Sequence, residues 1–516
     1  MSESKVIKKL ESLIDEKIKE ESVSKISSKL FFNYSRMVVK ERAIPEVADG
    51  LKVVHRRIIF VMSKLATHDF KKSARIVGET MGKFHPHGDL SIYQSLIRLA
   101  RPFSIRYPLI IGQGNFGSLD GDNPAAMRYT EARLSKISTN FFLSFLHSGC
   151  ADFISNYDNN EFEPYQIPTL FPFLLVNGAS GIGVGVRSFL PSHNLGEIVQ
   201  TLIHVLDNPA ATLDEILGKK FFGPDLPLRG KILFENLESL KKIYSEGRGI
   251  LNVLAPINIE KKKSEKRFRT SLIITDFPHP LDKANVLIKL ASLVKSDSRF
   301  SPISSIHDET SGEGVRVVIE LRPRTPSKMM RGFLYRFAGL KRSLAVDFVA
   351  LVEKKLRRLS FLDLIKIYLD SSLRIIKRHA QHLLKEKEVA CEILHGIVVA
   401  SANITEVTKI IKRAKTKREA TKTLQQLFSL SFRQADTILA FRLSNLLKVE
   451  VEETIRKLQK IEKEIKELTI LFKEERSQKL LLKKNLLELA KGFADPRRTE
   501  IIFSDQADIL GLKDSI

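Results

Sequence analysis

The chain has 516 residues, several times a usual domain of roughly 150 residues, and 43% of them are hydrophobic, so it can bury several cores. Its 84 Lys and Arg against 60 Asp and Glu give a net charge of +24, which favours a polyanionic partner, nucleic acid before an anionic membrane. Two cysteines, Cys150 and Cys391, exclude a disulfide framework and a cysteine zinc site, and without a signal peptide or an unbroken apolar span we expect a soluble, cytoplasmic protein.

The N-terminal residues 1–32 predict a helical arm. Ile7, Leu10, Ile14 and Ile18 follow one another at helical spacing and form one apolar face. This face can pack on the chain's own body or on a partner.

Residues 33–165 predict short helices separated by Gly and Pro. We expect Ser73 to cap one helix, the stretch 85–88 to break it, and Asp89 to cap the next. Two helices joined by a short Gly-containing turn have the layout of a helix-turn-helix. Taken alone, that layout is more often ordinary packing than a DNA-reading element.

Residues 166–358 mix helical and strand signals, which predicts an α+β domain. Segments 251–254 and 271–274 predict strands on either side of the charged run 260–269, and 315–321 predicts another strand. We expect the charged run to be the exposed tip of a hairpin.

From residue 359 the pattern becomes almost wholly helical. Two near-heptad seams predict an antiparallel coiled coil, with a first arm at 359–395, a helical knob at 396–450 and a return arm at 451–516. Near the end of the knob, Leu443, Leu446 and Leu447 offer an apolar patch, so we expect the chain to form a homodimer there. The seams consist of Ile365, Leu369, Leu373, Ile376, Ala380 and Leu383, and of Val451, Ile455, Leu458, Ile461, Ile465, Leu468 and Phe472.

Three segments of the first 135 residues are dense in side chains that bind phosphates. Such a surface holds a duplex backbone by charge. The segments are 42–57, 71–89 and the glycine-rich stretch 112–122, which leads to Ala126-Met127-Arg128-Tyr129-Thr130-Glu131.

These segments also allow simpler interpretations. His85 and His87 have metal-ligand spacing but no evident third ligand, and Asp120-x-Asp122 is typical of a turn. The stretch 112–121 lacks the Lys-Ser/Thr ending of an ATP loop, and 181–185 lacks the acidic residue of a dinucleotide site. We therefore predict no metal, ATP or dinucleotide site on this chain.

In this order and spacing the segments resemble the A subunit of bacterial type IIA DNA topoisomerases, the DNA-breaking subunit of gyrase and topoisomerase IV. The resemblance covers about residues 30–505 and is most specific at 126–131. It implies a multidomain α+β fold: a winged-helix cleavage domain at 33–165, a tower domain at 166–358 and a coiled coil ending in a dimer-gate knob. Further matching segments are 168–195, 308–310, 316–320, 434–443 and 495–501.

The resemblance implies roles for individual residues. Tyr129 would attack a DNA phosphodiester, Arg128 would hold the phosphate, and Ile182 would wedge between base pairs and bend the duplex. The simpler interpretations are a buried phenol for Tyr129 and a core side chain in a β-turn for Ile182. Catalytic and backbone-binding roles are not separable for the DNA-contacting set Arg42, Lys52, His55, Arg56, Arg57, His85 and His87.

The resemblance also implies partners and cofactors. The partners are double-stranded DNA, a second copy of this chain in a homodimer, and a B subunit that completes an A2B2 heterotetramer. The cofactors are Mg²⁺ and ATP, both bound by the B subunit. The expected location is the cytoplasm, in association with the nucleoid. Because the sequence stops at Ile516 without the DNA-wrapping domain of gyrase A, we expect relaxation or decatenation. The alternatives are an architectural coiled-coil paralogue that no longer cleaves DNA and a tyrosine recombinase, although the latter explains neither the coiled coil nor the motif order.

One departure from the family pattern concerns Leu90 and Gln94. The family usually has Ser or Thr and Asp or Glu at these positions, where they anchor a quinolone-bound metal ion through its waters. Four residues apart on one helix, both side chains face the same way, but Leu90 offers no oxygen and Gln94 no charge. We therefore expect this subunit to be insensitive to quinolones.

Overall fold

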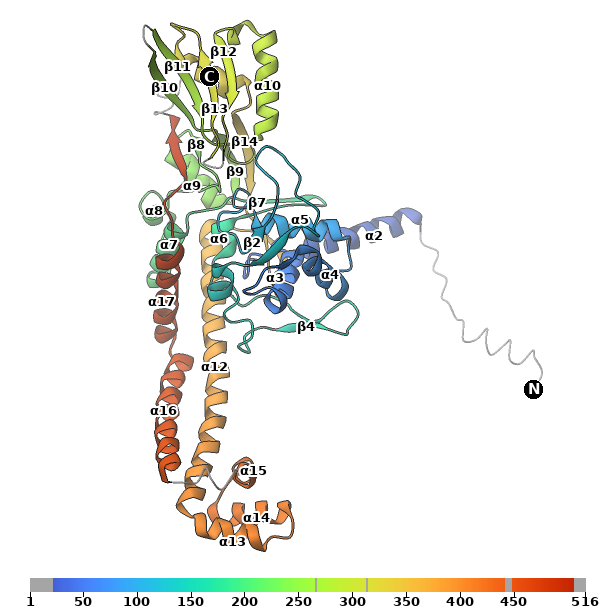
Figure 1. Ribbon diagram of the computed structural model, residues 1–516, viewed down its shortest axis with the longest axis vertical. Coiled ribbons are helices and arrows are strands. Elements are labelled where there is room, and N and C mark those ends of the chain that lie inside the picture. The colour runs from blue at the N-terminus through green and yellow to red at the C-terminus, as the bar shows by residue number, and fades with distance from the viewer. Residues whose placement is uncertain (1–21, 265–266, 312–313, 441–447, 505–516) are drawn as a thin grey trace, which may run out of the picture.

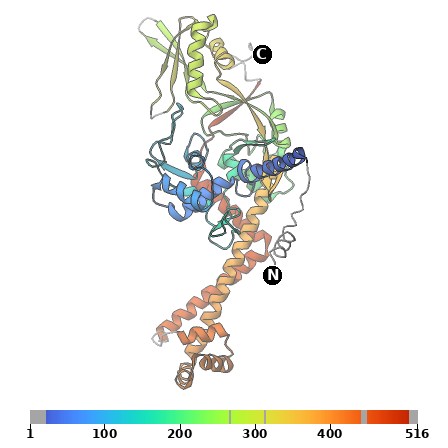
Figure 2. The same ribbon diagram turned by 90° about the vertical axis from the view of Figure 1, so that its right-hand side faces the viewer.

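The computed structural model describes residues 22–264, 267–311, 314–440 and 448–504. The molecule is long: a sheet-rich body leads into a helical stalk that ends in a helical knob (Figure 1). Turned by 90°, the four-stranded sheet and the knob again lie at opposite ends (Figure 2). The mixed α+β class expected from the sequence is confirmed. Ile7, Leu10, Ile14, Ile18, Leu443, Leu446 and Leu447 lie outside the described residues.

The N-terminal unit combines three helices with a three-stranded antiparallel sheet in the order β1-β3-β2. Its helices bury one apolar face each; in the first, Ile58, Ile59 and Met62 are fully buried. Its elements are α3 (Val53–Leu65), α4 (Ser73–Lys83), α5 (Asp89–Ala100), β1 (Lys71–Lys72), β2 (Ile110–Gln113) and β3 (Glu131–Leu134). After them come η2 (Ser138–Phe142), β4 (Phe153–Ser155) and β5 (Phe162–Pro164), and before them lie α2 (Val23–Val38) and η1 (Val39–Ala43).

The predicted helix caps are wrong. α4 and α5 begin at Ser73 and Asp89, but their N-cap residues are Lys72 and Gly88, and neither makes a side-chain capping bond. Ser73 lies inside the first turn, facing β3, so its hydroxyl accepts a hydrogen bond of 2.9 Å from Thr130 Oγ1 instead.

A six-stranded sheet forms the centre of the body, in the order β17-β8-β9-β14-β7-β6. Its edge strand β17 pairs in parallel with β8, although about 270 residues separate them in the chain, and the other pairs are antiparallel. Its strands are β6 (Ala179–Gly183), β7 (Val186–Leu190), β8 (Gly230–Phe234), β9 (Arg248–Leu254), β14 (Lys341–Asp347) and β17 (Thr499–Phe503). Around it lie α6 (Phe173–Asn177), α7 (Leu195–Asp207), α8 (Leu213–Ile216), α9 (Leu237–Glu246) and the hairpin β15 (Val349–Val352) and β16 (Lys355–Arg358).

A four-stranded antiparallel sheet, in the order β10-β11-β13-β12, has its own hydrophobic core at the end of the body. Residues 260–264 and 267–269 of the charged run lie in the paired strands β10 and β11, and the expected tip at 265–266 lies outside the described residues. The strand expected at 251–254 is β9, which pairs in the six-stranded sheet instead. The elements are β10 (Ile257–Ser264), β11 (Arg267–Ile274), α10 (Lys283–Ser296), η3 (Ser298–Phe300), β12 (Ile303–Asp308), β13 (Val317–Leu321) and α11 (Ser327–Phe337).

The stalk is built on α12 (Phe361–Ala402), whose start is fixed by a capping box between Ser360 and Asp363. The upper half of α12 packs into the body core with α17, and the lower half runs beside α16, where Lys387 and Glu464 form an ion pair of 2.6 Å. The remaining helices are α13 (Ile404–Arg413), α14 (Lys417–Phe428), α15 (Phe432–Ala440), α16 (Lys448–Lys473) and α17 (Glu475–Phe493). No single helix of the described residues is long and apolar enough to cross a membrane; α12 and α13, bent by 93°, pass that test only as a pair.

Candidate functional site

The turn at 127–129 connects the glycine-rich loop to β3 and is anchored to α4. The backbone N–H of Ser73 donates to Thr130 O at 2.9 Å, and the N–H of Ala74 donates to Met127 O at 3.1 Å. Thr130 is fully buried, and its hydroxyl donates to Ser73. These hydrogen bonds fix the backbone of the turn on α4 and leave the side chains on its outer surface free.

Tyr129 points away from this anchor. Its side chain is 65% exposed, which excludes the buried phenol that was the simpler interpretation. The Arg128 guanidinium lies over the Tyr129 ring, 4.8 Å from the centroid. Within the described part of the chain the Tyr129 hydroxyl has no hydrogen-bond partner, so it is open to a ligand.

A second group joins Arg57, His85 and His87. Arg57 donates two hydrogen bonds to Glu163, at 2.6 and 2.7 Å, and a third to His85 Nδ1 at 2.8 Å. The His85 and His87 rings meet edge to face at 4.5 Å. Burial, followed by the charges of Arg57, His87 and Arg42, lowers the pKa of His85 to about 4.

His85 is therefore neutral at physiological pH. Because arginine only donates, Nδ1 of His85 accepts, and its proton is on Nε2. His87 and Arg42 are exposed beside it and can meet an anion from solvent.

Arg56 occupies a different environment from its neighbour. Its side chain is buried and donates to both carboxylate oxygens of Asp49, at 2.6 and 3.0 Å. Asp49 also accepts from the backbone N–H groups of Leu51 and Ile167. This pair holds the start of α3 in the core, so Arg56, expected among the DNA-contacting residues, has its guanidinium committed inside the protein.

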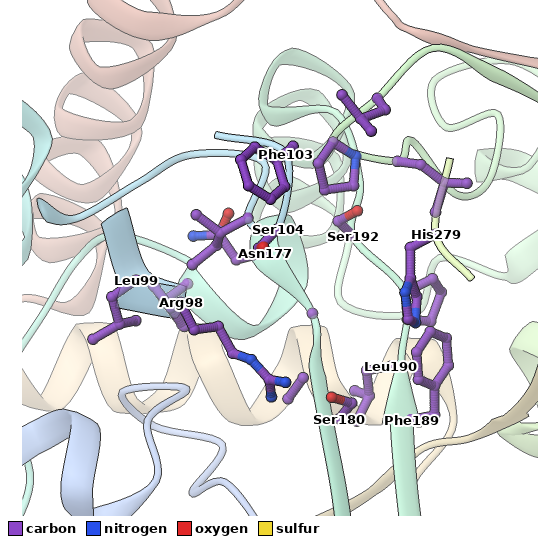
Figure 3. A pocket seen from close by; sticks show the side chains of 18 of the residues that line it. Arg98, Leu99, Phe103, Ser104, Asn177, Ser180, Phe189, Leu190, Ser192 and His279 are labelled. Atoms are coloured by element: carbon purple, nitrogen blue, oxygen red, sulfur yellow. The ribbon is translucent and has the colours of Figure 1, made fainter. Parts of the chain in front are cut away.

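Lys52 and His55 line a cavity of about 280 Å³ between the N-terminal unit and the central sheet. Lys52 Nζ donates to Ser180 O at 2.6 Å. Figure 3 shows Arg98 extending toward Ser180 on one side of this cavity and Phe189 with His279 on another. Lys52, His55 and Arg98 of the N-terminal unit thus line one cavity with Ser180 of β6, and Lys52 is hydrogen-bonded to that strand.

Burial and the cations of this cavity also shift two pKa values. Burial, then Arg98, lowers the pKa of Lys52 to about 8. Burial, then Lys52 and Arg98, lowers the pKa of His55 to about 3, so His55 is neutral at physiological pH. A bound polyanion would favour the charged form of Lys52.

Ile182 lies on the β6–β7 hairpin and is 82% exposed, so it is not the core side chain of the simpler interpretation. The neighbouring Gly181 packs on η1, where an added Cβ would come within 2.0 Å of Ala43 O. The glycine thus permits a close backbone approach. It sets Ile182 next to the segment that carries Arg42.

The exposed face of α5 carries Leu90, Gln94 and Arg98. Leu90 is 68% exposed, and the four-residue steps set the three side chains in one stripe. Sequence reasoning missed Arg98, although its spacing from Gln94 was a usable signal. It also missed Glu163 and His279, for which no local pattern exists.

The structure therefore brings the expected residues into separate groups. Arg42, Arg57, His85 and His87 form one, and Lys52, His55 and Ile182 lie around β6. Among the described residues no hydrogen bond or ion pair joins either group to Arg128 or Tyr129. The described residues also contain no group of three or more His, Cys, Asp or Glu side chains placed to hold a metal ion.

Comparison with known proteins gives one consistent family. The family described as the A subunit of DNA gyrase/topoisomerase IV matches residues 42–487. The A subunit of DNA gyrase from Mycoplasma pneumoniae is 37% identical over 502 residues, which cover 97% of this chain and 59% of that protein. The DNA gyrase A subunit of Borrelia hermsii is 37% identical over 487 residues, which cover 92% of this chain and 58% of that protein. The DNA gyrase A subunit of Staphylococcus aureus strain Mu50 is 38% identical over 489 residues, which cover 94% of this chain and 54% of that protein. The chain thus spans a little over half the length of these relatives.

Proposed function

Because the chain belongs to the family of DNA gyrase and topoisomerase IV A subunits, we propose that it is the DNA-cleaving and rejoining subunit of a type IIA topoisomerase. In this proposal it makes transient double-strand breaks through which a second duplex passes, in relaxation or decatenation. The observation that carries the proposal is the anchored turn that leaves Tyr129 exposed and free beside Arg128.

The chemistry exchanges one phosphodiester for another. The Tyr129 oxygen attacks a backbone phosphorus, the bond to the 3′ oxygen breaks, and the tyrosine proton is transferred to that leaving oxygen. Arg128 offsets the negative charge that grows on the phosphate oxygens. Because the phosphotyrosine bond keeps the energy of the broken bond, the reverse attack by the 3′ hydroxyl rejoins the strand without fuel.

Mg²⁺ and ATP belong, in this proposal, to the B subunit. The side chains of the described residues do not fit a metal site, so we derive no step through a metal on this chain. Here the chain's own residues bind, orient and bend the duplex.

The duplex would lie over the cationic groups and the β6–β7 hairpin. Arg42, His87 and Lys52 would contact phosphates, and His55 and His85 would serve as neutral donors or acceptors. Arg56 would act indirectly by fixing α3. Ile182 would insert between base pairs, where unstacking costs a few kcal/mol that the contacts of a bent duplex offset.

The B subunit would dock on α2, completing A2B2. This helix buries none of its residues, and Leu30, Phe31 and Phe32 are all exposed. Large apolar side chains exposed on a helix are typical of an interface.

The test is a cleavage assay. The full chain is mixed with a cognate B subunit, Mg²⁺, ATP and supercoiled plasmid, then treated with detergent and protease. We expect linear DNA with protein on its 5′ ends from the wild type and none from Tyr129→Phe, which should still bind duplex nearly as well, because many cations share the binding energy. Covalent linkage at wild-type levels in Tyr129→Phe would refute the assignment.

A further inference from the structure

Lys283, at the start of α10, is a buried lysine outside the groups described above. Its side chain is 1% exposed. Nζ lies 2.5 Å from Asp120 Oδ1, 2.8 Å from Asp308 Oδ2 and 2.8 Å from Thr310 Oγ1. An ammonium has three N–H donors, so each one has a partner.

The three partners come from two parts of the molecule. Asp308 and Thr310 lie at the end of β12, and Thr310 donates both its N–H and its hydroxyl to Asp308 Oδ1. The four-stranded sheet thus holds two of the partners in place by itself. Asp120 comes from the tip of the glycine-rich loop, nine residues before Tyr129.

The stem of this loop is fixed separately on the N-terminal unit. Tyr93 donates to Ala125 O at 2.6 Å, Ala125 N–H donates to Asn115 O at 3.0 Å, and Arg101 donates to Phe116 O. The loop is therefore tied to α5 at its stem and to the four-stranded sheet at its tip.

The same contact forms part of the cavity wall. Leu119, next to Asp120, and Leu281, two residues before Lys283, both line the cavity that Lys52 and His55 also line. If the tip of the loop detached from Lys283, Leu119 would leave the wall of this cavity.

We propose that Lys283 is a positioning residue: an ionic latch that ties the glycine-rich loop, which leads into the Tyr129 turn, to the four-stranded sheet. With the latch closed, the loop is ordered before DNA arrives, so ordering it costs nothing at the moment of attack. The position of the Tyr129 turn relative to the four-stranded sheet is then fixed. This inference rests on the proposed function for its effect on cleavage, but the latch itself does not depend on it.

Asp120→Asn is the sharpest variant. Asp120 is half exposed, so the change removes the loop's arm of the latch and leaves the buried Lys283–Asp308 pair intact. The matched control is Asp122→Asn, in the same loop, whose carboxylate accepts from Ser118 at 2.6 Å and does not reach Lys283. Lys283→Met and Asp308→Asn open the latch from the other side, and Asp120→Glu tests whether a carboxylate alone restores it.

The first measurement is hydrogen exchange of residues 115–129 in the full chain without DNA. We expect Asp120→Asn to speed exchange on the order of tenfold without lowering the melting temperature. Asp122→Asn should leave exchange unchanged, and Asp120→Glu should restore most of the protection. Equal exchange in Asp120→Asn and wild type, or equal acceleration in both asparagine variants, would overturn the latch.

The second measurement is single-turnover formation of the covalent DNA complex with the B subunit. Asp120→Asn should slow it while duplex affinity stays unchanged. Faster exchange with an unchanged cleavage rate would overturn the positioning role. Failure of the wild type to form any covalent complex would count against the proposed function, while the exchange measurement would still decide the latch.

Discussion

At the scale of single residues, cationic side chains that are close in the sequence differ in whether they are already paired inside the protein. Arg56 is committed to Asp49 inside the core, and Arg57 divides its donors between Glu163 and His85. Arg42 and Arg128, by contrast, are exposed. The positive charge that a duplex meets therefore comes from fewer side chains than the basic composition suggests.

Glu46 gives a pH prediction at this scale. Burial, then Asp49, raises its pKa from 4.5 to about 7. The folded state therefore keeps this proton more firmly than the unfolded chain, a contribution fully present below pH 4.5 and lost as the pH rises through about 7. At about 1.4 kcal/mol per pKa unit, the loss is on the order of 3 kcal/mol.

We expect Glu46→Gln, which keeps the oxygen that accepts from Glu353 N–H, to stabilise the chain at pH 8 and to change little at pH 4.5. Thermal unfolding at both pH values measures this. Glu41→Gln, at an exposed glutamate, is the control. Equal stabilisation by Glu46→Gln at the two pH values would contradict the prediction.

Leu90 and Gln94 give a drug prediction. Both are exposed on one face of α5, yet they offer a metal-bound water neither a hydroxyl nor a charge. Losing a charge-assisted hydrogen bond costs roughly 1.5–3 kcal/mol, about a tenfold to hundredfold loss of affinity. We expect Leu90→Ser with Gln94→Asp to trap cleavage complexes at a far lower quinolone concentration than the wild-type chain. Trapping of both enzymes at the same concentration would show that the metal bridge is irrelevant here.

At the scale of elements, the β6–β7 hairpin carries the exposed Ile182, the proposed wedge, next to a close backbone contact with η1. Gly181 lets the hairpin approach η1, and Lys52 donates a hydrogen bond to the carbonyl oxygen of Ser180. The energy of insertion can then bend the duplex rather than displace the hairpin.

We expect Ile182→Ala to reduce bending of a short duplex, measured by energy transfer between labels on its ends. Losing most of the inserted side chain forfeits ~1–2 kcal/mol, which weakens binding about tenfold. Ile288→Ala, at a 69% exposed isoleucine on α10, is the matched control. A bend angle that Ile182→Ala leaves unchanged would rule out the wedge.

At the scale of the whole molecule, buried charges connect distant parts of the chain. Arg106, whose side chain is fully buried, forms ion pairs with Asp225 at 2.9 Å and Asp495 at 2.7 Å. The pair with Asp495 connects the N-terminal unit to the segment between α17 and β17, and the pair with Asp225 connects it to the segment between α8 and β8.

The knob at the far end of the stalk gives a prediction of assembly. It has a small core of its own, and Leu427 and Phe432 are 62% and 66% exposed. We expect the full chain to sediment as a dimer at micromolar concentration, and Leu427→Lys with Phe432→Lys to shift it toward monomer. A wild-type chain that stays monomeric over that range would disprove dimerisation through the knob.

The sequence by itself was sufficient for the α+β class, the helices α4, α5, α12 and α16, and the family. Helical periodicity, turn residues and the motif around Tyr129 are local properties of the chain, and local patterns survive whatever packs against them. The Ser73 cap is an exception, because its buried hydroxyl has a tertiary partner, Thr130, that no local pattern records.

Only the tertiary structure decided which charges stay free. Arg57 finds Glu163 over a hundred residues away, Lys283 reaches back to Asp120, and β17 returns to pair with β8. Such pairings depend on burial and on the approach of distant segments, because burying a charge costs free energy unless an oppositely charged partner is buried with it. The composition shows that the protein is basic, and the tertiary structure determines which of its cationic side chains are accessible to a ligand.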